Sequence, residues 1–171
     1  MTILSTSGVE HACTVLSSPA LIRLITEIDD NGPVPPRALR RTVPDVPGVH
    51  LRRDTGRARL LGLVHVQPGA GLALTVSGGE LAGVYDELAR WARRHAYPAP
   101  VCDFTGRIQH TLALLTGPPL RSSQSGHRRC ADGPAGGVED GADIARLRRL
   151  LEEWLHDNPL VAGVADTGIA A

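Results

Sequence analysis

The stretch from residue 57 to 78, RARLLGLVHVQPGAGLALTVSG, constrains the fold most, because the spacing of its apolar residues changes twice. On either side of it, apolar residues recur at the spacing of an amphipathic helix. Inside it, residues 63–67 and 72–76 form two short, partly β-branched runs that are joined by Pro-Gly-Ala-Gly. Two such runs around a Pro-Gly turn predict a β-hairpin. The chain should therefore place one hairpin between helices.

Helical patterns account for most of the remaining chain. Residues 19–30 carry one apolar stripe, with Ser18 as the expected N-cap and Pro19 in the first turn. Residues 79–95 carry a second stripe, with Ser77 as the expected cap. Further helices are expected at 8–16, over about two turns within 35–45, at about 48–62, at 104–116 and at 142–157. The predicted fold class is mainly α with a small β-hairpin (α+β).

Composition divides the chain at about residue 98. Residues 1–98 are predicted to form one domain, and residues 99–171 a C-terminal helical region. Within the second region, residues 117–141 are rich in Gly, Ser, Pro and charge, which is typical of a disordered loop. Residues 16–21 resemble 115–120, and residues 88–92 resemble 151–155. One interpretation is that the second region is a degenerate copy of the first.

Charge is unevenly distributed along a chain whose formal net charge is +0. Residues 37–59 hold seven arginines and two acids, a local charge of +5, so the rest of the chain carries −5. The arginines fall on the two successive helices that precede the hairpin. Such an asymmetry indicates partners better than the total charge does, and here it favours a polyanion.

The order of the predicted elements is that of a winged helix-turn-helix. A helix is followed by a short helix, a turn, a basic helix, the hairpin and a long helix. A helix fits the major groove of duplex DNA, where arginine can contact guanine edges or phosphates. The hairpin, or wing, would then lie over the neighbouring backbone. The sequence therefore predicts residues 48–62 as the recognition helix and residues 63–76 as the wing.

Short motifs in this region carry a resemblance to a known family. They are Gly62-Leu63-Val64, Leu74-Thr75 with Gly78 to Leu81, Leu88 with Trp91-Ala92, and an early Cys13. In this order and spacing they resemble the HxlR-type winged helix-turn-helix regulators, and more loosely the MarR-type, over residues 13 to 97. The resemblance implies a DNA-binding transcriptional regulator.

The candidate DNA-binding residues are mostly the arginines of the basic segment. Three in the recognition helix are the best candidates for base or phosphate contact, and those before it should contact phosphates, which position the protein without specifying sequence. The hairpin tip offers Gln67 and backbone amides but no cation. The full set is Arg37, Arg40, Arg41, His50, Arg52, Arg53, Arg57, Arg59 and Gln67, of which Arg52, Arg53 and Arg57 are the three.

Other chemistry has little support in the sequence. Cys13 would suit redox sensing through a thiol, but a plain structural cysteine is the simpler interpretation. The segment His127 to Cys130 has the spacing of half a metal site with no second pair, so no metal is expected. No catalytic or nucleotide-binding motif occurs, so neither an enzyme nor a cofactor is expected.

The expected partners are double-stranded DNA and a second copy of the chain. Leucine-rich helices ending in Trp91 and Trp154 suggest an apolar surface that a homodimer would cover. No run is long enough to cross a membrane and no secretory signal is evident, so a cytoplasmic protein is predicted. A small-molecule effector can coexist with DNA binding. The alternative is a degenerate winged helix that has lost DNA binding and acts through protein contacts or ligand or thiol sensing.

Overall fold

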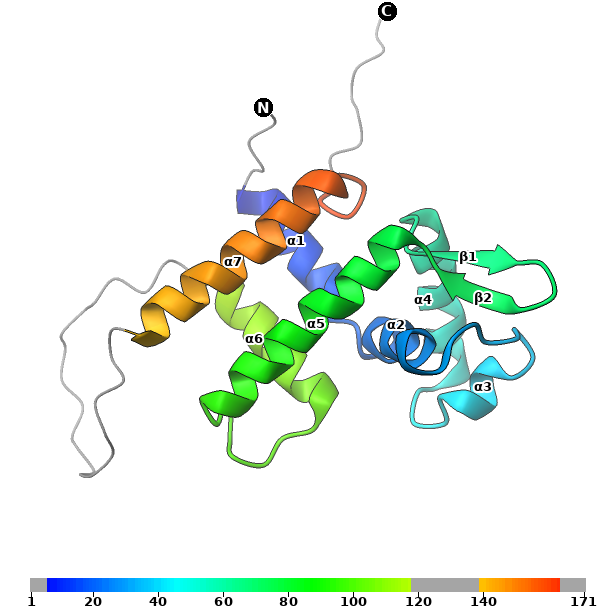
Figure 1. Ribbon diagram of the computed structural model, residues 1–171, viewed down its shortest axis with the longest axis horizontal. Helices are drawn as coiled ribbons and strands as arrows, with labels where there is room; N and C mark the ends of the chain where they lie inside the picture. The colour runs from blue at the N-terminus through cyan, green and yellow to red at the C-terminus, as the bar shows by residue number, and fades with distance from the viewer. Residues whose placement is uncertain (1–5, 118–138, 164–171) are drawn as a thin grey trace, which may run out of the picture.

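The computed structural model describes residues 6–117 and 139–163 (Figure 1). The fold is mainly helical with one small antiparallel hairpin, as predicted from the sequence. The elements are α1 (Thr6–Leu16), α2 (Pro19–Asn31), α3 (Leu39–Thr42), α4 (Gly48–Leu60), β1 (Val64–Gln67), β2 (Gly71–Leu74), α5 (Val76–Arg94), α6 (Phe104–Thr116) and α7 (Glu139–Asp157).

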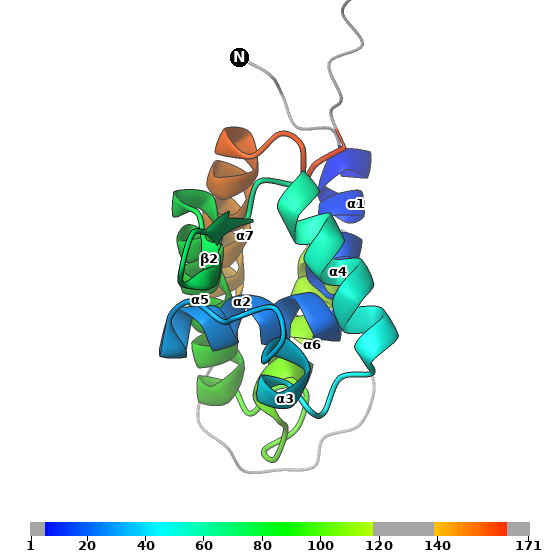
Figure 2. The ribbon, with the colours of Figure 1, turned by 90° about the vertical axis from the view of Figure 1, so that its right-hand side faces the viewer.

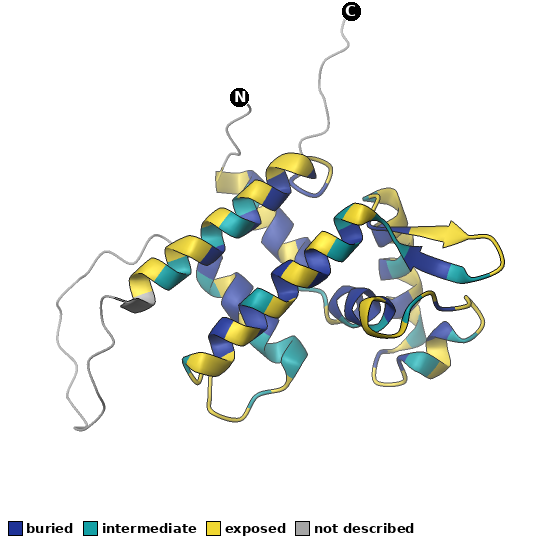
Figure 3. Ribbon diagram, viewed as in Figure 1, coloured by how far each residue is buried: buried dark blue, intermediate teal, exposed yellow. Residues whose placement is uncertain are grey.

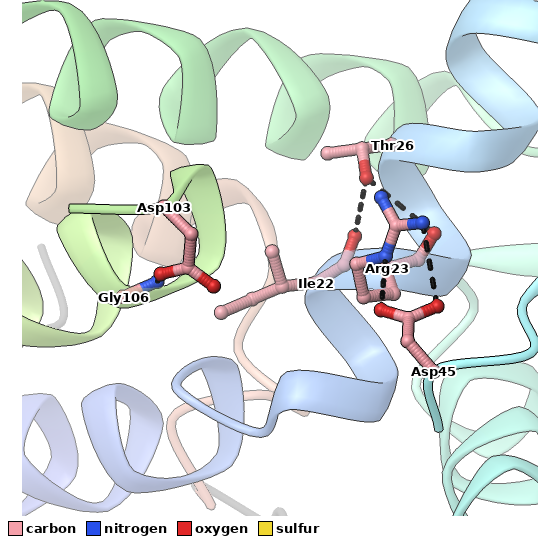
Figure 4. A network of polar contacts seen from close by, with 6 residues as sticks. All are labelled: Ile22, Arg23, Thr26, Asp45, Asp103 and Gly106. Atoms are coloured by element: carbon pink, nitrogen blue, oxygen red, sulfur yellow. Dashed lines mark hydrogen bonds and ion pairs between the residues drawn. The ribbon is translucent and has the colours of Figure 1, made fainter.

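Local signals placed most helix boundaries correctly. Pro19 opens α2 directly after Ser18, and the helix ends where Gly32 follows Asn31. Asp103 caps α6 by accepting a hydrogen bond from the Gly106 amide at 2.8 Å (Figure 4). One prediction was too long, since α3 makes only one turn rather than two. Prolines on both sides of α3 limit its length.

The hairpin forms where the hydrophobic period changes. β1 and β2 pair antiparallel, with Val64 opposite Leu74 and Gln67 opposite Gly71. Val34, in the segment before α3, adds a short bridge to Leu72 through two backbone hydrogen bonds of 2.8 and 2.9 Å. Gly71 is required there, because its φ is +117° and a Cβ would lie 2.5 Å from the Val34 carbonyl oxygen. This bridge ties the chain before α3 to the hairpin.

Thr75, rather than Ser77, caps the long helix, so the prediction of Ser77 was wrong. The Thr75 hydroxyl accepts a hydrogen bond from the Gly78 amide at 3.1 Å and donates to the Gly62 carbonyl at 2.6 Å. Gly78 packs so closely under the end of α4 that a Cβ would lie 2.0 Å from the Leu63 carbonyl oxygen. The threonine thus joins the start of α5 to the turn that follows α4, and α5 begins before residue 79.

One hydrophobic core includes residues from both sides of the predicted boundary at residue 98. α5 lies along the middle of the molecule, with α6 and α7 packed against it. The hairpin and α3 lie at the end of the molecule away from α6 and α7 (Figure 1). Tyr85 of α5 is fully buried and donates a hydrogen bond to the Leu16 carbonyl at 2.8 Å.

The two tryptophans are buried within a single chain. Trp91 is 4% exposed and Trp154 is 5% exposed, and the Trp154 indole donates to the Ser77 carbonyl at 3.2 Å. The apolar faces that suggested a homodimer are therefore covered by intramolecular packing of α5, α6 and α7. They provide no argument for a second copy.

Two sequence predictions fall largely outside the described residues. The loop predicted at 117–141, which includes the half metal site from His127 to Cys130, coincides mostly with residues 118–138. The same residues separate α6 from α7, where the middle of a second winged helix would lie. The described part of residues 99–171 consists mainly of α6 and α7 packed on α5.

Candidate nucleic-acid interface

An ion pair links α2 to the turn between α3 and α4. Arg23 on α2 holds Asp45 through two contacts, Nε to Oδ2 at 3.0 Å and Nη2 to Oδ1 at 3.5 Å (Figure 4). A guanidinium that holds a carboxylate with two hydrogen bonds restrains orientation as well as distance. Val43 and Val46, on either side of Asp45 in this turn, are buried in the core. The turn therefore sets the direction in which α4 leaves α3.

A buried carboxylate anchors α4 on α2. Asp54 has no exposed surface, and it accepts hydrogen bonds from the Ser18 hydroxyl and from Arg53 Nε, the latter at 2.9 Å. Ser18, the residue before α2, uses its side chain for this contact and makes no cap hydrogen bond. The contact joins two helix segments that are 36 residues apart in sequence.

The surroundings of Asp54 keep it ionised. Burial by itself would raise the pKa of the Asp54 carboxyl, because a charge is costly to remove from water. Hydrogen bonds from Arg53 and Ser18, and the charges of Arg53 and Arg57, outweigh burial and hold the pKa below its usual value. Arg53 is thus engaged in holding the fold together, although its side chain remains 59% exposed.

The side chains of α4 form three stripes, as expected for a helix that advances about 100° per residue. Leu51, Asp54 and Ala58 are buried. A second stripe, which includes Arg52 and Arg59, faces α3. A third carries Val49, His50, Arg53, Arg57 and Leu60, all exposed. The structure therefore separates Arg52 from Arg53 and Arg57, which the sequence had grouped as one contact set.

A groove of about 480 Å³ lies between α3 and α4 at the end of the molecule that faces the viewer in Figure 2. Apolar side chains, including Pro36, Leu39 and Leu51, form much of its wall. Two glycines of α4 also line it. The arginines at its surface are Arg37, Arg40, Arg52 and Arg59, and none of its described lining residues is acidic.

The two glycines shape this groove. The Nε of Arg40 lies 3.1 Å from the point that a Cβ on Gly48 would occupy, so the arginine rests against the first residue of α4. No atom lies within 4 Å of a Cβ built on Gly56, so the helix surface there is open. Glycine weakens a helix interior, but here Gly56 leaves space between arginines.

Most of the basic segment remains uncompensated. Its two acids are both engaged, Asp45 by Arg23 of α2 and Asp54 by Arg53. Five of the seven arginines in this segment are exposed and lie away from Asp54. Among the described residues, no ion pair or hydrogen bond engages their side chains. These five are Arg37, Arg40, Arg41, Arg52 and Arg59. All but Arg41 line the groove. The structure thus concentrates cationic charge on one end of the molecule.

The hairpin adds polar side chains beside this surface. Gln67, at the end of β1, and His65, two residues before it, are exposed and share one face of the strand. β1 is mostly exposed, whereas β2 is half-buried or buried against the core (Figure 3). His65 was missing from the predicted set, and only its alternation with Gln67 could have suggested it.

No family model, curated protein or solved structure matches the chain.

Cys13 lies in an environment opposite to that of a sensor thiol. Its side chain is only 3% exposed in the core beneath α1. Burial raises the pKa of the Cys13 thiol to about 11, although the charge of Arg148 acts in the opposite direction. A thiol that senses oxidants needs exposure and a lowered pKa. In this structure Cys13 packs as a small apolar residue.

Within the described ranges, no group of three His, Cys, Asp or Glu side chains is arranged to hold a metal ion. None of the helices described combines the length and apolarity needed to cross a bilayer.

The sequence did not reveal the structural role of Asp54. The sequence presented it only as one of two acids that reduced the charge of the basic segment. Its position at i+3 from Leu51 and i−4 from Ala58 places it on the apolar stripe, which was the available signal. The groove had no sequence signal, since it depends on how α3 packs beside α4.

Proposed function

We propose that this protein is a cytoplasmic, dimeric transcriptional regulator that binds duplex DNA through a winged helix-turn-helix. The observation that carries the proposal is the set of five exposed arginines on and before α3 and on α4 that have no described ion-pair partner. Both neighbouring acids face other partners. A surface kept cationic in this way suits a phosphate backbone.

In this proposal, α4 is the recognition helix and the hairpin is the wing. The exposed stripe with His50, Arg53 and Arg57 would face the base edges of the major groove, with Arg53 held in place by Asp54. The arginines at the α3–α4 groove would contact phosphates, together with Arg41. Because the hairpin tip has no cation, Gln67 and His65 would add little affinity.

The argument for a dimer in this proposal is that many sequence-specific DNA-binding proteins are two-fold symmetric. Their recognition helices lie about one helical turn, roughly 34 Å, apart. The described apolar faces do not require a partner, so the dimer could form on DNA rather than in free solution. Measuring the mass of the protein by sedimentation, alone and with a duplex, checks this part independently of affinity.

The direct test is a DNA titration at two salt concentrations. Duplexes of random sequence and from the region upstream of the gene are titrated at about 50 and 200 mM salt. Five phosphate contacts in each protomer predict a roughly 10²–10³-fold loss of affinity per bound protomer over this range. Absence of binding at the lower salt concentration contradicts the proposal.

A second candidate function, binding to a protein partner by a degenerate winged helix, is favoured by exposed apolar side chains. Val49 and Leu60, at the two ends of α4, are 68% and 83% exposed. Val66 on β1 is 51% exposed, and Val76, the first residue of α5, is 80% exposed. If DNA binding is absent at low salt, these four residues mark the surface to test with a protein partner.

A further inference from the structure

Two exposed arginines on the outer stripe of α4 are held differently. Arg53 and Arg57 lie four residues apart, so they share one face of the helix. The Nε of Arg53 donates to Asp54 Oδ1 at 2.9 Å, whereas among the described residues no hydrogen bond engages the Arg57 side chain. The guanidinium of Arg53 is therefore restrained, and that of Arg57 is oriented only by the nearby charge of Asp54.

The carboxylate that restrains Arg53 is itself fixed. Asp54 has no exposed surface, and its second oxygen, Oδ2, accepts a hydrogen bond from the Ser18 hydroxyl. Tyr85 of α5 and Gln109 of α6 donate to the carbonyls of the two residues before Ser18, at 2.8 and 2.7 Å. The turn that supplies the Ser18 hydroxyl is thus tied to two further helices. A binding group with such rigid support loses little conformational entropy when it binds.

A structural link between α4 and α2 does not by itself require a charge at residue 54. A neutral amide could also accept the hydrogen bond from Ser18, and burying a carboxylate is costly. An ionised carboxylate is suited to the guanidinium of Arg53, with which it makes a charge-assisted hydrogen bond. The charge at this buried position is therefore directed to a side chain that is 59% exposed.

The contact with Asp54 leaves most donors of Arg53 available. A guanidinium has five N–H donors in a rigid fork, and the contact uses only the one on Nε. The two Nη groups match the O6 and N7 acceptors that guanine presents in the major groove, the commonest specific contact between proteins and DNA.

We propose that Asp54 is a positioning residue that orients Arg53 to recognise guanine at one position of the DNA site. The Nη groups of Arg53 would donate to O6 and N7 of this guanine while Asp54 holds Nε. Arg57, on the same face but without this restraint, would add affinity more than choice of base. This role rests on the proposed DNA-binding function, and it adds the base that is read and the residue that sets the reading.

The first test needs no DNA. Nitrogen-15 relaxation of the arginine Nε–H groups measures their motion on the picosecond-to-nanosecond timescale. The order parameter of Arg53 Nε should lie above about 0.6, the upper limit for flexible groups, and that of Arg57 Nε below it. Asp54→Asn should lower the Arg53 value to that of Arg57. Equal mobility of the two arginines in the unaltered protein overturns the proposal, whether or not the protein binds DNA.

The second test identifies the base and the atom that are read. The preferred duplex is selected from a random pool with the unaltered protein, and each guanine is replaced in turn by 7-deazaguanine, which lacks the N7 acceptor. At one guanine this replacement should lower affinity at least about fivefold. Arg53→Gln should abolish that effect, while Arg57→Gln should lower the overall affinity and keep it. If no guanine responds to Arg53→Gln, the proposal is overturned although DNA binding stands.

Asp54→Asn separates positioning from a merely structural role. At the same guanine it should reduce the preference over 7-deazaguanine to less than about twofold, because Arg53 is no longer held in the orientation that N7 requires. Partial unfolding would lower the affinities for both duplexes equally, so it leaves their ratio unchanged. Glu87→Gln removes the same charge from a paired carboxylate on α5 and should also leave the ratio unchanged.

The outcomes distinguish this role from the DNA-binding function. A full preference for guanine in Asp54→Asn overturns the positioning role alone. If the unaltered protein binds no duplex, the DNA-binding function fails and the reading of guanine fails with it.

Discussion

Arginine side chains have different surroundings at the two ends of this molecule. At the α5–α7 end, Arg90 and Arg146 both pair with Glu87, and Arg148 donates to the carbonyls of Leu115 and Gly117 at the end of α6. At the α3–α4 end, five exposed arginines have no such described partner. At the α5–α7 end, arginines thus make several contacts that support the fold, although Arg93, Arg94 and Arg149 are exposed without such a described contact. At the α3–α4 end, all five of these arginines leave their charge available.

The difference shows how a chain of zero net charge can present a cationic surface. The acids that could neutralise the basic segment are few, and both are held away from most of its arginines. Clustered like charges repel one another and destabilise the folded state. A surface that keeps this repulsion is better explained by a partner than by stability. Five predictions test this contrast, from the largest expected effect to the smallest.

Removing charge at only one end should abolish DNA binding. We expect the triple change Arg40→Gln, Arg52→Gln and Arg59→Gln to lower DNA affinity at least about 100-fold. It should reduce the salt slope by about 3 per bound protomer, because each protomer loses three phosphate contacts. The control changes Arg93, Arg94 and Arg149, three exposed arginines at the other end, to Gln. Equal losses for both triples, measured by fluorescence anisotropy, would show that total charge matters and its position does not.

Removing the buried carboxylate should destabilise the fold. Asp54→Asn is expected to lower the free energy of unfolding by about 2 kcal/mol, since it removes a buried charge-assisted contact to Arg53 and Ser18. Asp45→Asn should cost less than about 1 kcal/mol, because the Asp45 side chain is 54% exposed. Urea unfolding measures both. A larger loss for Asp45 than for Asp54 would place the anchor of α4 in the turn.

Acid should also weaken the contacts of Asp54 that hold α4. The pKa of Asp54 is lower in the folded protein than in the unfolded chain, where a value of about 3.9 is usual. Its contribution to stability is therefore complete above the unfolded pKa and is lost as pH falls through the folded pKa. Unfolding free energies measured between pH 6 and 3 should fall less steeply for Asp54→Asn than for the unaltered protein. Parallel pH profiles would contradict the assigned role.

Alanine at the exposed glycines of α4 and α5 should stabilise the protein equally. Gly56→Ala and Gly83→Ala are each expected to raise the free energy of unfolding by about 0.5–1 kcal/mol, since neither new methyl group meets a neighbour. Thermal unfolding followed by circular dichroism measures the shift. A destabilising effect of Gly56→Ala alone would mean that α4 depends on a close approach at that residue.

The ion pairs of Glu87, at the α5–α7 end, should contribute least to the free energy of unfolding. Glu87→Gln is expected to lower the free energy of unfolding by less than about 1 kcal/mol, because both its arginine partners lie on the surface. The loss should shrink further in 1 M salt, which screens exposed pairs. An effect as large as that of Asp54→Asn would show that arginine pairing holds α7 in place.

The sequence by itself determined the elements that depend on local interactions. Pro19 marked the start of α2 correctly, and the change of period near residue 63 located the hairpin. These signals act over a few residues, so they can be recognised along the chain. The cap of α5 was misplaced because Thr75 is selected by its contact with Gly62, which is 13 residues away.

Only the tertiary structure decided how the basic segment is organised. The crossing of α2 and α4 buries Asp54 and turns Arg53 and Arg57 to one side, and the packing of α3 beside α4 opens the groove at Arg40 and Arg59. Likewise, α6 and α7 cover the two tryptophans within one chain, although the sequence alone was equally consistent with their burial in a homodimer. In each case the deciding contact joins residues distant in sequence, and their packing geometry cannot be derived from local spacing alone.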